Sequence, residues 1–245
     1  MENKVYFQRY EQKYVINSDQ FEKTRAVLNR NAAPDKYFHS SIRNVYLDTD
    51  DYLLVRRSIE HPVYKEKLRF RSYGSVTLED KIFVEIKKKY RGIVYKRRMA
   101  LPIIDVDSWF SGEKNPPETQ IGREIEFMRC RYKGIHPMMY ISYERDSYIA
   151  DNGLRITFDD NILASKRDLT LEAEPHGVAI LPEGYRLMEV KTIYGYPVWL
   201  RSVLSDLKIY KTTFSKYGNA YKIIELKKTP LEYTPLERIC PDPSS

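Results

Sequence analysis

Cysteine and histidine are scarce in this chain of 245 residues. The two cysteines, Cys130 and Cys240, lie far apart and match neither a disulfide framework nor a metal-ligand spacing, which favours a reducing compartment. The four histidines are scattered along the chain. Their spacing argues against a zinc site and against a histidine acting as catalytic base.

Long apolar runs are also missing. The N-terminal sequence "MENKVYFQRYEQKY" has no hydrophobic core of a signal peptide, and no segment approaches the length of a membrane span. We therefore expect a cytoplasmic protein without a membrane segment. No internal repeat is visible. The composition predicts one folded domain over residues 1–228 and a proline-rich C-terminal tail over residues 229–245.

Charge, in contrast, is abundant. The chain carries 41 Lys and Arg against 34 Asp and Glu, for a net charge of +7. This surplus indicates a polyanionic partner, which leaves nucleic acid, an anionic membrane and a phosphate-rich small molecule open. The many acidic residues are more than a simple basic clamp needs.

The hydrophobic pattern predicts many strands and a few helices. Asn17 and Gln20 give a capping box at the start of a helix over residues 17–31. Further helices are expected at residues 121–134, 197–210 and 214–224, and a turn at residues 151–153 joins two strands. Because strands and helices do not alternate regularly, the pattern favours an antiparallel α+β architecture.

Within the predicted strands, Arg, Lys and Glu recur at every second position, so they share one face. "KLRFRSY" and "FVEIKKK" show the pattern, with Lys67, Arg69 and Arg71 in the first and Glu85 and Lys87 in the second. For any single strand, the simplest interpretation is a solvated face. For the whole set, helices that cover the apolar faces would leave the charges inside a closed antiparallel β-barrel.

Such an interior needs counter-charges, because unpaired buried charges cost several kcal/mol each. The carboxylates on the same faces neutralise some of the bases, but the bases are more numerous. A polyanion inside the barrel would supply the missing negative charge, and Arg and Lys are the usual donors to phosphate oxygens. The carboxylates would then suit a divalent cation between protein and phosphates.

The ordered segments "YEQKYVI", "NVYLDTDDY", "KLRFRSYG", "IFVEIKKK", "YKRRMAL", "ISYERDSY", "LRITFD", "MEVK" and "FSKYGNA" resemble the catalytic domain of VTC polyphosphate polymerases, in the triphosphate tunnel metalloenzyme (CYTH-like) superfamily. The resemblance runs over about residues 6–225. It implies a closed antiparallel barrel of about eight strands with helices packed outside. It also implies that the terminal phosphoryl group of ATP passes to a growing inorganic polyphosphate chain. Mn²⁺, or Mg²⁺ in its place, is the implied cofactor.

The motifs and the charged faces together assign the site. Catalytic roles are expected for Lys13, Arg69, Arg71, Lys87 and Arg98. Binding of phosphate or substrate is expected for Arg145, Arg155, Lys191, Lys216 and Tyr143. Metal binding is expected for Glu189, Glu85 and Glu11. Arg145 and Arg155 are open to a second interpretation, as salt-bridge partners of nearby acids. Glu11 is likewise open to pairing with Arg or Lys instead of binding metal. Lys88 and Lys89 are expected at a solvated edge.

Three functions remain open at this stage. The triphosphatase branch of the superfamily usually begins with ExExK, whereas Arg9 replaces the first glutamate here in "RYEQK". The loss of one carboxylate favours transfer to phosphate over hydrolysis, and a triphosphatase remains the alternative. The third function is a non-catalytic binder of polyphosphate or nucleic acid. We expect ATP and inorganic polyphosphate or pyrophosphate as partners, and no nucleic acid, because the glutamates would repel its backbone.

Overall fold

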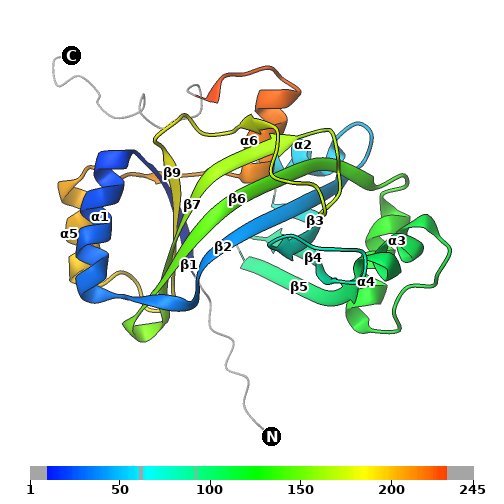
Figure 1. Cartoon of the computed structure of the whole chain (residues 1–245), viewed down its shortest axis with the longest axis horizontal. Helices are drawn as coiled ribbons and strands as arrows, with labels where there is room; N and C mark the ends of the chain where they lie inside the picture. The colour runs from blue at the N-terminus through cyan, green and yellow to red at the C-terminus, as the bar shows by residue number, and fades with distance from the viewer. Residues whose placement is uncertain (1–9, 61–62, 92, 231–245) are drawn as a thin grey trace, which may run out of the picture.

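A computed structural model describes residues 10–60, 63–91 and 93–230, and the fold is organised around one antiparallel ten-stranded sheet (Figure 1). The longer strands are β1 (Tyr10–Ile16), β2 (Ala33–Asp48), β3 (Tyr64–Tyr73), β4 (Lys81–Tyr90), β5 (Ile93–Pro102), β6 (His136–Ala150), β7 (Leu154–Ser165) and β9 (Arg186–Thr192). The short strands are β8 (Val178–Ala179) and β10 (Lys211–Thr212). The helices are α1 (Ser18–Asn31), α2 (Leu53–Ile59), α3 (Ile103–Ser111), α4 (Gln120–Arg131), α5 (Val198–Asp206) and α6 (Lys216–Ile224), with a 3₁₀ turn, η1 (Asp151–Gly153), between β6 and β7. The predicted α+β class is confirmed.

The strands follow the order β10-β1-β9-β7-β6-β2-β3-β4-β5, with β8 beside β7. In the described part of the chain β5 and β10 form the two edges and do not pair with each other. The predicted barrel of about eight strands is therefore corrected to an open sheet of ten. β5 borders only β4, so it lacks the second neighbour that would close the ring of hydrogen bonds.

The sheet is nevertheless strongly curled. β1 and β4 are separated by β9, β7, β6, β2 and β3 along the sheet, yet Lys87 Nζ on β4 lies 3.8 Å from a carboxylate oxygen of Glu11 on β1. Side chains at such distant places in a flat sheet cannot meet. The face that carries both residues is therefore the concave one.

Helices α1 and α5 cover the convex face at one end of the sheet, and α3 and α4 cover it at the other (Figure 1). The capping box predicted at Asn17 and Gln20 is present, and it starts α1. Phe21 and Leu28 of α1 pack on Ile156 of β7 in one apolar cluster. The prediction that the apolar strand faces lie outward under helices is confirmed for these four helices.

Helix α6 departs from the prediction that all helices pack outside, because its first turn lies on the concave face. Tyr217 stacks on Tyr46 of β2 with ring centroids 4.5 Å apart, and its hydroxyl donates a 2.9 Å hydrogen bond to Asp48. Asp48 also accepts hydrogen bonds from the backbone N–H groups of Leu54 and Val55 at the start of α2. One buried carboxylate thus ties β2, α2 and α6 together.

Part of the predicted tail, from residue 231 onward, lies outside the described residues, as do Arg9 and Cys240. Gly92, between β4 and β5, lies outside them too. No described helix is both long enough and apolar enough to cross a membrane.

Candidate active site

The concave face is lined by charged side chains from seven of the strands and from α6. Their positions follow from strand alternation, since residues two apart on a strand point to the same face. The charged residues that meet there through ion pairs are Glu11, Lys13, Arg69, Arg71, Glu85, Lys87, Lys96, Arg145, Asp159, Glu189, Lys191 and Lys216. On β3 and β4, most of the residues that alternate with these charges are apolar and pack beneath α3 and α4. The concave face also carries an apolar cluster beneath α6, in which Tyr46, Ile141 and Leu187 pack with Tyr217.

Glu85 on β4 is the centre of the first group of charges. Arg69 on β3 donates hydrogen bonds of 2.9 and 2.7 Å to one of its carboxylate oxygens, and Lys96 Nζ on β5 lies 2.6 Å from the other. Arg71 follows at 3.8 Å. Burial raises the pKa of Glu85, but the three cations outweigh burial and lower it to about 2. Glu85 is thus an ionised, firmly held carboxylate.

Asp159 on β7 is the centre of the second group, and it is fully buried. Arg145 on β6 donates two hydrogen bonds to it, of 2.5 and 2.7 Å, and Lys216 of α6 forms a direct ion pair with it. Burial favours a raised pKa for Asp159, but Arg145 and Lys216 hold the pKa below its usual range. The same pairing outweighs burial and raises the pKa of Lys216.

Glu189 on β9 lies beside this second group and contacts more cations at greater distances. Lys13 lies at 3.3 Å, Lys191 and Lys216 at 3.4 Å and Arg145 at 3.5 Å from its oxygens. Burial acts to raise the pKa of Glu189, but these cations lower it well below its usual value. Glu189 is therefore ionised without a short hydrogen bond to any of its four neighbours.

Tyr143 on β6 lies between the two groups. Its hydroxyl accepts a 3.2 Å hydrogen bond from Arg71, while Arg145 and Lys216 lie over its ring at 5.3 and 4.5 Å from the centroid. Burial raises the pKa of the phenol, yet Arg71, Arg145 and Lys216 lower it to about 8. This shift measures how strongly positive the centre of the concave face is.

Lys87 on β4 and Glu11 on β1 meet across the curled sheet, 3.8 Å apart. Burial lowers the pKa of Lys87 to about 8, with Glu11 opposing and Lys13 adding to the shift. Glu11 also lies 3.8 Å from Lys13. At 3.8 Å, both cations lie beyond hydrogen-bond distance of Glu11, in contrast to the short contacts of Glu85.

Cations outnumber carboxylates on this face, as the sequence predicted. The structure gathers eleven of the thirteen predicted residues into one connected set: Lys13, Arg69, Arg71, Lys87, Arg145, Lys191, Lys216, Glu11, Glu85, Glu189 and Tyr143. Since each buried cation without a counter-charge costs free energy, the face is suited to bind a multiply charged anion.

Two predicted residues are not brought into this set. Arg98 on β5 is exposed, and its guanidinium stacks over the ring of Phe83 at 4.6 Å. Arg155, at the N-terminal end of β7, forms an ion pair with Asp35 at 2.8 Å. The second interpretation, that arginines here pair with nearby acids, describes the geometry of Arg155 and also that of Arg145.

Sequence reasoning missed three members of the site. Asp159 alternates with Arg155 on the same face of "LRITFDD". This position is the sequence feature that could have assigned Asp159 to the site. Lys96, two residues before Arg98, reaches Glu85 in its place. Tyr46 accepts a 2.8 Å hydrogen bond from Arg69, and no sequence pattern marked it.

The three glutamates predicted to bind metal are not equivalent. Glu85 is held at 2.6 to 2.9 Å by Arg69 and Lys96, whereas Glu11 and Glu189 are neighbours that share Lys13. Thr157, the cross-strand partner of Glu189, has a buried hydroxyl without a hydrogen-bond partner in the described residues. No group of three or more His, Cys, Asp or Glu suited to a metal occurs there. Glu11, Glu189 and Thr157 thus provide an incomplete oxygen set that phosphate oxygens and water would complete, as is common for Mg²⁺.

Fold and charges together define a class of α+β proteins in which a curled antiparallel sheet surrounds a cationic interior. The family model of the VTC domain matches residues 8–225, so the chain belongs to the VTC domain family, as the resemblance of its motifs implied.

Two solved structures share the fold at 14% sequence identity. A candidate adenylate cyclase from Bacillus halodurans has a TM-score of 0.54, with 85% of this chain and 95% of that chain covered. A candidate adenylyl cyclase from Hippeastrum, with a dominant triphosphatase activity, has a TM-score of 0.53, with 91% and 98% covered. No curated protein matches the chain in sequence.

Proposed function

We propose that this protein is a metal-dependent transferase that passes the terminal phosphoryl group of ATP to the end of an inorganic polyphosphate chain. The observation that carries the proposal is the excess of cations around two ionised glutamates, Glu11 and Glu189, on a concave face. Membership of the VTC domain family supports it. ATP and polyphosphate are the substrates, and the cytoplasm is the proposed location.

The chemistry needs no catalytic base. An oxygen of the terminal phosphate of the acceptor chain attacks the γ-phosphorus of ATP, and the bond from that phosphorus to the oxygen bridging to the β-phosphate breaks, so ADP leaves. The attacking oxygen is already anionic, so no proton has to be removed. Phosphoryl transfer depends mainly on positioning and on neutralising charge. The absence of a histidine or cysteine from the charged set agrees with this requirement.

Arg69, Arg71 and Arg145 are the proposed clamp for the transferred and neighbouring phosphates. Their guanidinium groups are fixed by Glu85, Asn44 and Asp159, so their free N–H groups are positioned before substrate arrives. Lys13, Lys87 and Lys216 add positive charge around Glu11 and Glu189. Lys191 and Tyr143 complete the proposed binding set, and Arg98 and Arg155 are assigned to its periphery.

A divalent cation, proposed as Mn²⁺ or Mg²⁺, would be held by Glu11 and Glu189, with Thr157 as a further oxygen donor. When bound, it would neutralise charge on the phosphate oxygens that it touches. Glu85 is excluded from this role because its two oxygens are held by Arg69 and Lys96 at 2.6 to 2.9 Å. The chain's own contribution is to keep the two glutamates ionised and close to the lysines.

A triphosphatase is the second candidate, because the similarly folded protein from Hippeastrum has a dominant triphosphatase activity. The same clamp would hold a triphosphate, and water would replace the acceptor chain. The two reactions differ in their products. A transferase releases ADP and lengthens chains, whereas a triphosphatase releases orthophosphate without chain growth.

The test is incubation with ATP and Mn²⁺, followed by electrophoresis of polyphosphate and by assays for ADP and orthophosphate. Lys87→Ala and Glu189→Ala should each lower chain synthesis about a hundredfold or more, as loss of one electrostatic contact to a transition state does. Lys23→Ala is the matched control, because Lys23 lies on the outer helix α1 and, within the described part of the chain, forms an ion pair only with Asp19. Full activity in both site variants would exclude the assigned site. Orthophosphate without chains would identify the triphosphatase, and salt-sensitive binding without turnover would identify a binder.

A further inference from the structure

Two lysines lie opposite each other at one end of the concave face. Lys65 on β3 pairs in register with Lys89 on β4, and the next inward pair along the ladder is Lys67 with Lys87. Because Lys65 and Lys67 are two apart on the strand, they point to the same face as Arg69. We call the pair Lys65 and Lys89 the lysine rung.

No carboxylate lies within 4.0 Å of Lys65, Lys67 or Lys89 among the ion pairs of the described residues. Lys65 donates a 3.2 Å hydrogen bond to the backbone carbonyl of Ser58, and Lys67 donates a 2.8 Å hydrogen bond to the hydroxyl of Ser215. These neutral acceptors cannot balance a full positive charge. This end of the face therefore differs from the centre, where each arginine has an acid.

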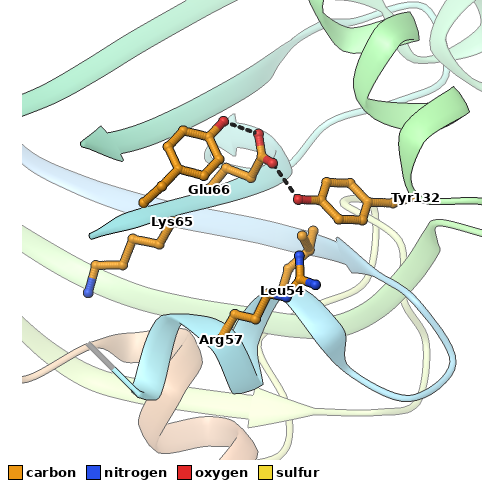
Figure 2. A pocket seen from close by; sticks show the side chains of 6 residues that line it. Leu54, Arg57, Lys65, Glu66 and Tyr132 are labelled. Atoms are coloured by element: carbon orange, nitrogen blue, oxygen red, sulfur yellow. Dashed lines mark hydrogen bonds between the residues drawn. The ribbon is translucent and has the colours of Figure 1, made fainter. Parts of the chain in front are cut away.

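The nearest acid in sequence does not neutralise the rung. Figure 2 shows Glu66 and Lys65 leaving β3 on opposite sides, with Glu66 bound by the hydroxyls of Tyr64 and Tyr132 at 2.8 and 2.6 Å. The cavity bordered by these residues has a volume of about 20 Å³, enough for one water molecule and too small for a ligand. Lys65 is therefore oriented away from the only buried carboxylate near it in the strand.

The lysines at this end of the concave face repel one another. Burial, followed by Lys89 and Lys13, lowers the pKa of Lys65. Burial, followed by Lys13 and Lys87, lowers the pKa of Lys67 well below its usual value. An anion bound here would relieve the repulsion and restore the full charge of both lysines.

The inward cations of β3 form a continuous row in the order Arg71, Arg69, Lys67 and Lys65. Six residues of strand span about 20 Å, which exceeds the length of three linked phosphates. A triphosphate held by the arginines therefore leaves the lysine end of the row unused. A longer polyanion would reach it.

We propose that the lysine rung, together with Lys67, binds the part of a polyphosphate chain that extends beyond the triphosphate held by Arg69 and Arg71. The inference rests on the proposed function for the identity of the polyanion. It assigns Lys65 and Lys89 to discrimination of chain length. Nucleic acid is the competing polyanion, and its binding is an outcome of the test.

The experiment measures binding of tripolyphosphate and of long-chain polyphosphate by calorimetry, over a range of salt concentrations and without ATP. The double variant Lys65→Gln, Lys89→Gln is compared with wild type. Lys23→Gln, Lys88→Gln is the matched control, because it also removes two positive charges, from α1 and from the outward face of β4, where Lys88 pairs with Glu124. Thermal unfolding of each variant shows that the fold is kept, since removing like charges should not lower Tm.

Wild type should bind the long chain more tightly than tripolyphosphate. In the rung variant the salt dependence of long-chain binding should fall by about one unit for each lysine removed. Tripolyphosphate affinity should stay within about twofold, as expected when no contact to it is lost. The control should match wild type with both ligands.

Equal loss of affinity for both ligands, no loss for either, or the same loss in the control would each overturn the rung as a chain-length subsite. A larger loss for single-stranded DNA than for polyphosphate would overturn the choice of polyanion. Chain synthesis from ATP is measured separately. A rung that behaves as expected in a protein that makes no polyphosphate would overturn the proposed function and leave the binding inference standing.

Discussion

Lys216 and Asp159 are 57 residues apart in the chain, yet their side chains form a buried ion pair on the concave face. Arg145 donates one hydrogen bond to each oxygen of the same carboxylate. One acid therefore joins a helix and two strands, and it compensates two buried cations. The stability of the fold and the charge of the site depend on the same group.

Replacing Asp159 with Asn should destabilise the protein by about 3–5 kcal/mol, because breaking a buried pair leaves cations without a counter-charge. The measurement is the free energy of unfolding in urea. Asp160→Asn is the control, since Asp160 pairs with Arg186 at 2.9 Å in a half-exposed position and should cost less than about 1 kcal/mol. Equal losses in the two variants would contradict a structural role for Asp159.

The acid sensitivity of the fold should depend on Glu85, whose pKa is lowered to about 2. Since the folded pKa lies below the unfolded value of about 4.3, the stabilisation from this group is complete above pH 5 and is lost as the pH falls toward 2. The full contribution is about 3 kcal/mol. Glu85→Gln should remove that pH-dependent part. The check is urea unfolding of both proteins from pH 6 down, and parallel pH curves would refute the assignment.

Tripolyphosphate affinity should decline as the pH rises through about 8, because Lys87 loses its charge there and Tyr143 gains a negative one. Lys87→Arg keeps the charge over the whole range, and Tyr143→Phe removes the phenol. In each single variant, tripolyphosphate affinity should therefore fall less with rising pH than in wild type. In the double variant it should be nearly independent of pH in this range. Calorimetric titrations at stepped pH values measure this. A double variant that keeps the wild-type profile would show that other groups are responsible.

Glu189→Gln should separate metal binding from anion binding. Without a metal, removing this negative charge should tighten tripolyphosphate binding about fivefold to tenfold, because repulsion of the anion is lost. With Mn²⁺ present, the gain in affinity that the metal gives wild type should disappear. Glu183→Gln, in an exposed turn, is the control.

Thermal unfolding of Glu189→Gln provides a second measurement. The cations around residue 189 lose their acid in this variant, so tripolyphosphate should raise its Tm more than it raises that of wild type. Equal shifts in both proteins would mean that the anion does not bind beside residue 189.

The sequence predicted the charged faces and the helices with the clearest caps and stripes. Alternation in β1, β3, β4 and β9 placed the charges on one face without knowledge of pairing. The capping box at Asn17 and Gln20 placed α1 within one residue. These features are local, so a short stretch of sequence contains all the information that they need.

Other features required tertiary contacts. Helix α2 has no side-chain cap of its own and depends on Asp48 from the preceding strand. Sheet closure depends on how far the strands curl, which alternation does not reveal. Arg98 and Lys96 show the same limit. Arg98 is the register partner of Glu85, yet Lys96 forms the ion pair with Glu85 and Arg98 stacks over Phe83.

Helix α6 supplies Lys216 near the C-terminal end of the described chain. Strand β1 pairs with β9, which follows it by about 170 residues in the chain. During synthesis from the N-terminus, a nascent chain therefore carries Asp159 and Glu189 before Lys216, one of the cations that pair with them, has left the ribosome. The charged set is completed only when α6 has been translated. A chain that stops before α6 keeps Asp159 paired with Arg145 but lacks the ion pair that ties β7 to a helix on the concave face.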